Sequence, residues 1–266
     1  MIFGYPPGDE RATPRPIGGD CGGDVHRITD GKGWGWRGVT YEGGDPTAII
    51  AAYLERGVHQ VSLQGGRTED ISWISQLPDL RRALCHTPLK DDTAVWDVDT
   101  LTHLVLHDTC KRPARIDQLP NLLSLEMDGR DGLDTAAHHP TLHYLASWRI
   151  KTDDLAWLQA GSALREVKLT RRRSQPLTTA GVNLNAVTHL QLGCLTLTDA
   201  SGLNTGQQLR SVDLDSIDFP SGAAEQTLEV LAGLPRLGLV NVWRCKGLTG
   251  ADVAAALPQV TVTELY

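Results

Sequence analysis

Two histidines and one aspartate in this sequence stand 21 residues apart, at His86, His107 and Asp128. Imidazole nitrogens and carboxylate oxygens bind transition metals and exchange protons near neutral pH. If a structural repeat brings the three together, they could form the centre of a metal-dependent or acid/base enzyme such as a metal-assisted hydrolase. We keep this enzyme as an alternative only, because repeated surface positions produce such a trio readily.

The other catalytic signatures are absent or misplaced. GWGWRG, residues 33–38, matches the glycine fingerprint of dinucleotide sites, but it does not stand between a buried strand and a helix start. The sequence contains no GxSxG, HExxH or phosphate-loop pattern. We therefore expect a protein that is not an enzyme and that has no cofactor.

Composition narrows the class of partner and the compartment. Among 266 residues, Lys and Arg number 25 and Asp and Glu number 32, so the net charge of -7 argues against nucleic acid. Five cysteines without a CxxC pair predict thiols in a reducing cytoplasm. Residues 1–16 lack an export signal, and no apolar run reaches the length of a membrane span.

An internal repeat organises most of the chain. Segments such as LTHLVL, LREVKL, VTHLQL and LRSVDL satisfy one LxxLxL template, in which we number the first apolar residue as position 1. The spacing between successive copies is 20 to 28 residues. The copies begin at Val58, Leu80, Leu101, Leu122, Leu142, Leu164, Val187, Leu209, Leu237 and Val260.

From residue 58 to residue 266 the sequence resembles the leucine-rich-repeat family, most clearly in LPNLLSLEM and LPRLGLVNV. The resemblance implies an α/β solenoid, a right-handed superhelix with a concave parallel sheet of about ten short strands. Its convex returns would range from irregular to helical. The chain departs from the family at position 9, where only Cys245 fits the usual Asn or Cys.

We predict one domain in three parts. Residues 1–44 form a Gly/Pro-rich segment with a hairpin around Asp30 and Gly31, residues 45–57 form a capping helix, and residues 58–266 form the solenoid. Asp45 is the expected N-cap of that helix and Gly57 its stop. Trp34 and Trp36 are available to cover the first coil.

Alternation along each strand points positions 3, 5 and 7 outward on the concave sheet. Aromatic rings there, with acids beside them, suit a basic protein or peptide, although the rings could instead pack against neighbouring loops. The predicted partner-binding residues are Glu126, Asp128, Tyr144, Trp148, Glu166, Lys168, Gln191, Asp213, Asp215 and Trp243. Arg171 to Arg173, with Arg149, form either a basic rim or a solvated turn.

The leading functional hypothesis is a protein-binding module that holds a protein or peptide on the concave face. We expect neither nucleic acid nor a membrane as its partner. One alternative is an inhibitor or immunity-type protein that neutralises a specific partner. A further possibility is a homo-oligomer formed through the C-terminal edge strand, residues 260–266.

Overall fold

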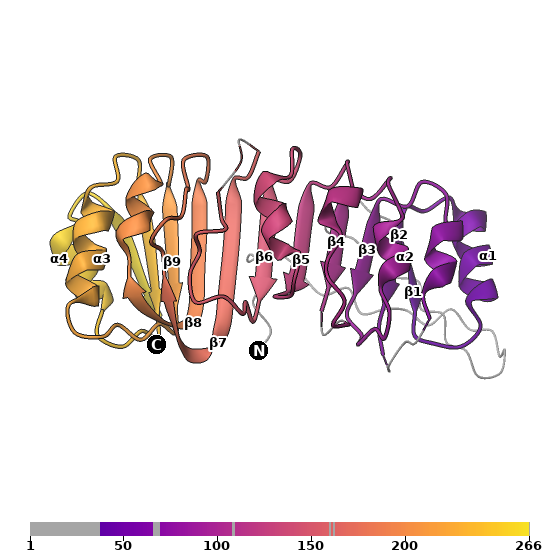
Figure 1. Cartoon of the computed structure of the whole chain (residues 1–266), viewed down its shortest axis with the longest axis horizontal. Helices are drawn as coiled ribbons and strands as arrows, with labels where there is room; N and C mark the ends of the chain where they lie inside the picture. The colour runs from indigo at the N-terminus through magenta and orange to yellow at the C-terminus, as the bar shows by residue number, and fades with distance from the viewer. Residues whose placement is uncertain (1–37, 66–69, 108–109, 160, 162, 266) are drawn as a thin grey trace. The chain divides into compact units, whose positions relative to one another are not determined.

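The computed structural model describes residues 38–65, 70–107, 110–159, 161 and 163–265. The chain divides into an N-terminal unit, Met1–Cys110, and a C-terminal unit, Lys111–Tyr266. Figure 1 colours them from indigo to yellow along the chain. The predicted hairpin around Asp30 and Gly31, with Trp34 and Trp36, lies outside the described residues.

The N-terminal unit is built on a parallel sheet. Its strands are β1 (Gly38–Tyr41), β2 (Gln60–Leu63), β3 (Arg82–Cys85) and β4 (His103–Leu106), each hydrogen-bonded to the next. The returns between them contain α1 (Pro46–Arg56), the 3-10 helix η1 (Ser72–Gln76) and α2 (Thr93–Trp96). Each coil thus makes one rung, a single strand, and one return.

The predicted helix after residue 45 is confirmed. The Asp45 side chain accepts a hydrogen bond from the Thr47 N–H at 2.9 Å, and Gly57 ends the helix in the left-handed conformation. Ile49 and Tyr53 are its buried residues. The repeat template missed β1, which pairs in parallel with β2, so α1 joins two rungs of the sheet.

The C-terminal unit continues the same plan. Its strands are β5 (Ser124–Asp128), β6 (Tyr144–Trp148), β7 (Glu166–Thr178), β8 (His189–Asp199), β9 (Ser211–Asp215), β10 (Leu239–Trp243) and β11 (Thr261–Leu265), parallel and hydrogen-bonded in that order. The returns contain the 3-10 helices η2 (Ile116–Gln118), η3 (Leu133–His138) and η4 (Ser201–Thr205), and α3 (Ala223–Ala232) and α4 (Gly250–Ala256). In Figure 1, α3 and α4 lie over one side of the strands.

The return helices follow the sequence signals. The longest repeat, of 28 residues, contains α3. The capping box of α4 is present, because the Thr249 side chain accepts from the Asp252 N–H while the Asp252 carboxylate accepts from the Thr249 N–H. Apolar spacing in α3 and the capping box in α4 are local signals that favour these helices.

The template leucines of the C-terminal unit stack as continuous buried rows. Val167 of β7 is in register with Leu190 of β8, and Leu190 with Val212 of β9. All three side chains are at most 2% exposed. Each coil covers the apolar side chains of its neighbour, which is the source of stability in a repeat protein.

Position 9 is apolar in three coils of the C-terminal unit, where the family usually has asparagine or cysteine. Ile150, Leu195 and Ile217 occupy it as buried side chains. Backbone groups at the turn bond to one another instead, with the Asp218 N–H donating to the Leu195 carbonyl at 2.9 Å and the Lys246 N–H to the Ile217 carbonyl at 2.8 Å. These bonds provide the partners that an asparagine ladder would otherwise supply.

The register predicted for the last strand is wrong by one residue. Leu239 pairs with Thr261, and Val240 with Val262, so Val262 joins the inward row. Glu264 also faces the returns, because a Cβ on Gly250 of α4 would lie 2.8 Å from it. A one-residue slip exchanges the two faces of a strand, and this register turns the half-buried Val262 inward in place of Thr263, which is exposed.

Candidate functional site

The side of the C-terminal sheet that bears positions 3, 5 and 7 of β5 to β10 is called the open face here. Its residues are mostly half-buried, whereas the residues between them are buried, as the alternation predicts. All ten predicted partner-binding residues belong to this face. One of them, Asp215, is only 2% exposed, so its side chain offers a partner little surface.

Two residues at the β6–β7 end of the open face form a charged cluster with an aromatic ring. The Lys168 Nζ lies 2.9 Å from the Glu166 carboxylate and 5.1 Å from the centre of the Tyr144 ring. A cation over a ring face is attracted by the ring's quadrupole. Lys168 is therefore held by two neighbours in the protein itself.

An aspartate, a tryptophan and an arginine form the same arrangement twice at the strand ends. Asp128 is in register with Trp148, and Arg149 reaches back to the Asp128 carboxylate at 3.4 Å. The second copy has Asp215 in register with Trp243, and Arg244 reaching back to Asp215 at 2.9 Å. We call these the two Asp/Trp-Arg clusters.

The direction of both arginines comes from the turn at position 8. Arg149 has φ of 58° and Arg244 has φ of 48°, and Cys194 and Ser216 adopt the same left-handed conformation at the equivalent position of their own repeats. Such angles are uncommon outside glycine and asparagine. Since four coils share this turn, the conformation belongs to the repeat, and the arginines use it to reach the previous rung.

Asp213 lies at the middle residue of β9, on the open face. Its Oδ1 accepts a hydrogen bond of 2.6 Å from the Asn241 side chain on β10. Burial raises the pKa of Asp213, against the lowering effects of the Asn241 hydrogen bond and of Lys168 and His189. The ionised carboxylate is thus poorly solvated in this position.

The stretch between the two tryptophans at position 7 holds small or buried residues. Going from Trp148 to Trp243, the intervening residues are Thr170, Gly193 and Asp215, all buried. Four rung spacings separate the two indoles, about 19 Å at the usual distance between strands. No large exposed side chain stands between them in this row.

The His86, His107 and Asp128 combination falls across the two units. The His86 and His107 rings contact each other edge-on in the N-terminal unit, with centres 5.3 Å apart. Burial, and then His107, lowers the pKa of His86. Asp128 belongs to the C-terminal unit, where Arg149 contacts it. Within the described ranges, no group of three or more His, Cys, Asp or Glu residues could hold a metal ion.

Arg171 does not belong to a basic rim or to a solvated turn. It lies within β7, its side chain is 3% exposed, and it donates to the Asp153 carboxylate at 2.9 Å and to the Pro176 carbonyl. A buried guanidinium needs this many acceptors to offset its lost hydration. Arg171 therefore joins β7 to Asp153 in the return that precedes it.

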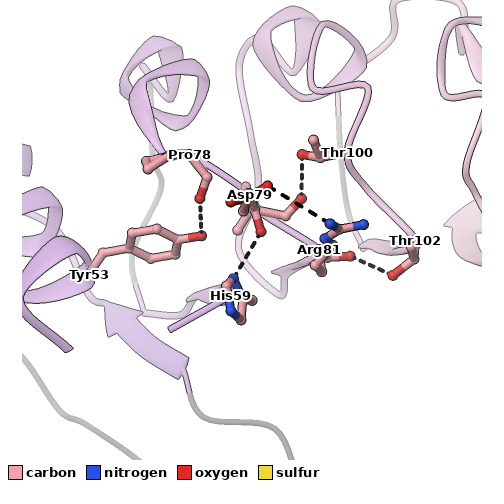
Figure 2. A network of polar contacts seen from close by, with 8 residues as sticks. Tyr53, His59, Pro78, Asp79, Arg81, Thr100 and Thr102 are labelled. Carbon is pink, nitrogen blue, oxygen red and sulfur yellow. Dashed lines mark hydrogen bonds and ion pairs between the residues drawn. The ribbon is translucent and has the colours of Figure 1, made fainter. Parts of the chain in front are cut away.

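A polar network that sequence reasoning missed joins successive coils of the N-terminal unit (Figure 2). The Tyr53 hydroxyl donates to the Pro78 carbonyl at 2.9 Å, and the His59 Nδ1 lies 3.2 Å from the Asp79 carbonyl. Burial raises the pKa of Tyr53 to about 12. Because the contacts are with backbone carbonyls of the turn before β3, we interpret this network as structural.

Two threonines extend the network to the next coil. The Thr100 hydroxyl donates to the Leu80 carbonyl at 2.8 Å, and the Thr102 hydroxyl to the Arg81 carbonyl at 3.0 Å. Thr188 repeats the second contact in the C-terminal unit, where its hydroxyl donates to the Arg165 carbonyl at 3.1 Å. Side-chain hydroxyls thus satisfy carbonyls at the start of several rungs.

Some residues of the open face that the sequence prediction did not name could have been found from the sequence. Asn241 occupies position 5 directly beside Asp213, which the repeat register predicts. Arg149 and Arg244 each follow a tryptophan, and the repeated Trp-Arg pair is visible in the sequence. Their contact with the preceding rung was not predictable, because it depends on the left-handed turn.

Parallel rungs in register, with the LxxLxL leucines stacked as buried rows, occur in both units. The chain has the leucine-rich-repeat architecture. The fold class predicted from the sequence, an α/β solenoid with short parallel strands, is confirmed. No helix in the described part of this repeat chain is both long and apolar enough to cross a membrane.

No protein-family model matches the chain, and no curated protein sequence matches it. Among solved structures, it is similar to an internalin (inlF) of Listeria monocytogenes, with 15% identity, 86% of each chain covered and a TM-score of 0.46. Internalin C2 (inlC2) of the same organism gives 20% identity over 82% of this chain and 83% of that one, with a TM-score of 0.47.

A structure of the Toll–Spatzle complex of Drosophila is also similar, with 13% identity, a TM-score of 0.44, and 86% of this chain against 43% of that chain covered. Identities this low have no bearing on the activity of the present chain.

Proposed function

We propose that the chain is a protein-interaction module whose C-terminal unit holds a protein partner on the open face. One observation carries this proposal: the open face presents half-buried Tyr144, Trp148 and Trp243 on strands whose alternate residues form the core. Tyr and Trp supply much of the binding energy in protein interfaces, because they bury large areas at a small entropic cost.

The charged residues around the rings support a protein partner over a small molecule. Ion pairs such as Lys168 with Glu166 hold charged groups in fixed positions along the sheet. Interfaces commonly combine aromatic anchors with a polar surround that sets register and specificity. We also propose that the protein acts in the cytoplasm. The cysteines form no CxxC pair in the sequence, which supports free thiols in a reducing compartment.

The test compares Trp148→Ala with Leu123→Ala. Leu123 is an exposed large apolar residue of the C-terminal unit, at 38%, and it lies at position 2, outside the open face. Each tagged full-length variant is used to capture proteins from native cell extract, and captured proteins are quantified against wild type. We expect Trp148→Ala to lose a specific partner and Leu123→Ala to retain it.

Equal capture by the two variants would exclude the open face as the binding surface. Circular dichroism of both variants establishes that each is folded before the comparison. Because Trp148 is half-buried, we include Trp148→Phe, which keeps an aromatic ring and should restore part of the capture.

A further inference from the structure

The acids of the open face differ in how their charge is compensated. Asp128, Asp215 and Glu166 lie in ion pairs with Arg149, Arg244 and Lys168. Asp213, in contrast, is bonded to the neutral amide of Asn241, and no ion pair to it is found among the described residues. The charge of the Asp213 carboxylate is therefore stabilised by a neutral amide and not by a cationic side chain.

The basic side chains nearest Asp213 already have partners in the protein. Lys168 on β7 contacts Glu166 and the Tyr144 ring. His189 on β8 has its Nδ1 2.9 Å from the Thr188 hydroxyl. A half-buried carboxylate loses hydration that an amide only partly replaces, so a cation from outside would gain more here than at a solvated acid.

The surroundings of Asp213 also fit the shape of an arginine. Trp243 stands two residues beyond Asn241 on β10, diagonal to Asp213, and diagonal neighbours on adjacent strands are about 7 to 8 Å apart. On the other side, the diagonal position on β8 is Gly193, which has no side chain. The Asp213 carboxylate and the Trp243 ring thus lie on the same face of neighbouring strands, at a separation that one guanidinium can span.

We propose that the protein partner places an arginine side chain on Asp213, with the guanidinium bonded to the carboxylate that Asn241 holds and stacked on the Trp243 ring. This proposal rests on the proposed function, since it names the group that the open face recognises. A guanidinium is planar, so it offers paired N–H donors to a carboxylate and stacks on aromatic rings. A lysine ammonium has neither the paired donors nor the flat face. The acids of the two Asp/Trp-Arg clusters do not compete for this arginine, because Arg149 and Arg244 already neutralise them.

The experiment titrates the isotopically labelled full chain with N-acetyl-arginine amide and follows the Trp243 indole N–H signal and the Asp213 carboxyl signal by NMR. N-acetyl-citrulline amide is the uncharged control of the same shape, and N-acetyl-lysine amide is the charged control of different shape. We expect the arginine compound to shift both signals and to lower the pKa of Asp213. The citrulline compound should shift neither signal, and the lysine compound should bind several-fold more weakly.

Asp213→Asn removes the charge and keeps an acceptor for Asn241, so it should weaken the arginine compound's binding about tenfold. Glu229→Gln on α3, an exposed acid on the return side, is the matched control and should bind as wild type. Equal binding of the arginine and citrulline compounds, or wild-type binding by Asp213→Asn, would overturn the proposal. Equal binding of the lysine compound would overturn the guanidinium assignment.

Partner capture separates this proposal from the proposed function. If Trp148→Ala loses the partner while Asp213→Asn keeps it at wild-type strength, the open face binds the partner but the arginine contact is wrong. If both variants keep the partner, the proposed function itself fails.

Discussion

Replacing Ile217 by asparagine tests why this chain lacks the family's asparagine ladder. Ile217 is fully buried, and its own carbonyl already accepts from the Lys246 N–H at 2.8 Å. The variant loses roughly 2 kcal/mol of apolar burial and leaves a buried amide short of partners, which costs about 2 kcal/mol more. We expect the free energy of unfolding to fall by about 4 kcal/mol.

Cys245→Asn is the matched comparison at the same position of the next coil. Cys245 is half-buried, and its thiol already lies within hydrogen-bond reach of two carbonyls, 3.4 Å from Leu214 and 3.5 Å from Trp243. An amide there inherits acceptors, so we expect a loss below about 1 kcal/mol.

Urea unfolding followed by circular dichroism measures both variants against wild type. If Ile217→Asn is as stable as Cys245→Asn, an asparagine ladder can form in this chain after all, and the explanation from backbone bonding at the turn is refuted. Ile217→Leu, which keeps the volume, should lose less than about 1.5 kcal/mol.

Three further predictions concern single sites in the C-terminal unit. Thr249→Ala removes the N-cap of α4 and should lower the free energy of unfolding by about 1 kcal/mol in urea titrations, whereas a change below a few tenths would show that the cap does not stabilise the helix. Gly202→Ala should lower the melting temperature strongly, because the added Cβ would lie 1.8 Å from the Thr179 carbonyl oxygen, while Gly238→Ala, with 3.9 Å to its nearest atom, should be tolerated. Asp213→Asn should raise stability at pH 7, because the folded pKa of Asp213 is raised and its ionised form opposes folding; the advantage should grow as pH rises from below 3.8 through the raised pKa, and a pH-independent difference would contradict it.

The rungs were predictable because their signal is local and repeated. Leu104, Leu125, Val167 and Leu190 all lie on strands as buried residues, as the spacing indicates. β1 escaped because GVTY contains no leucine, although Val39 and Tyr41 fill the corresponding buried places. Periodicity thus predicts the strands that carry the leucine template and misses one in which other apolar residues fill the buried places.

The sequence predicted which residues lie on the open face, but it did not predict which of their charges are paired. The columns correctly placed Glu166, Lys168 and Asp213 on one face. The burial of Asp215 and its pairing with Arg244 depend on a turn geometry that no residue pattern in this sequence encodes. A surface that reads as strongly acidic from sequence is therefore largely neutralised by neighbouring side chains.

The two Asp/Trp-Arg clusters have a consequence for avidity. A partner that contacts both is bound a second time at the effective concentration fixed by the first contact, so two weak attachments yield one strong complex. Since neighbouring coils supply most of the stability, losing or gaining one coil between the clusters would change their separation by about 4.8 Å without dismantling either. The number of coils between the two clusters therefore sets the distance between them in steps of one strand spacing.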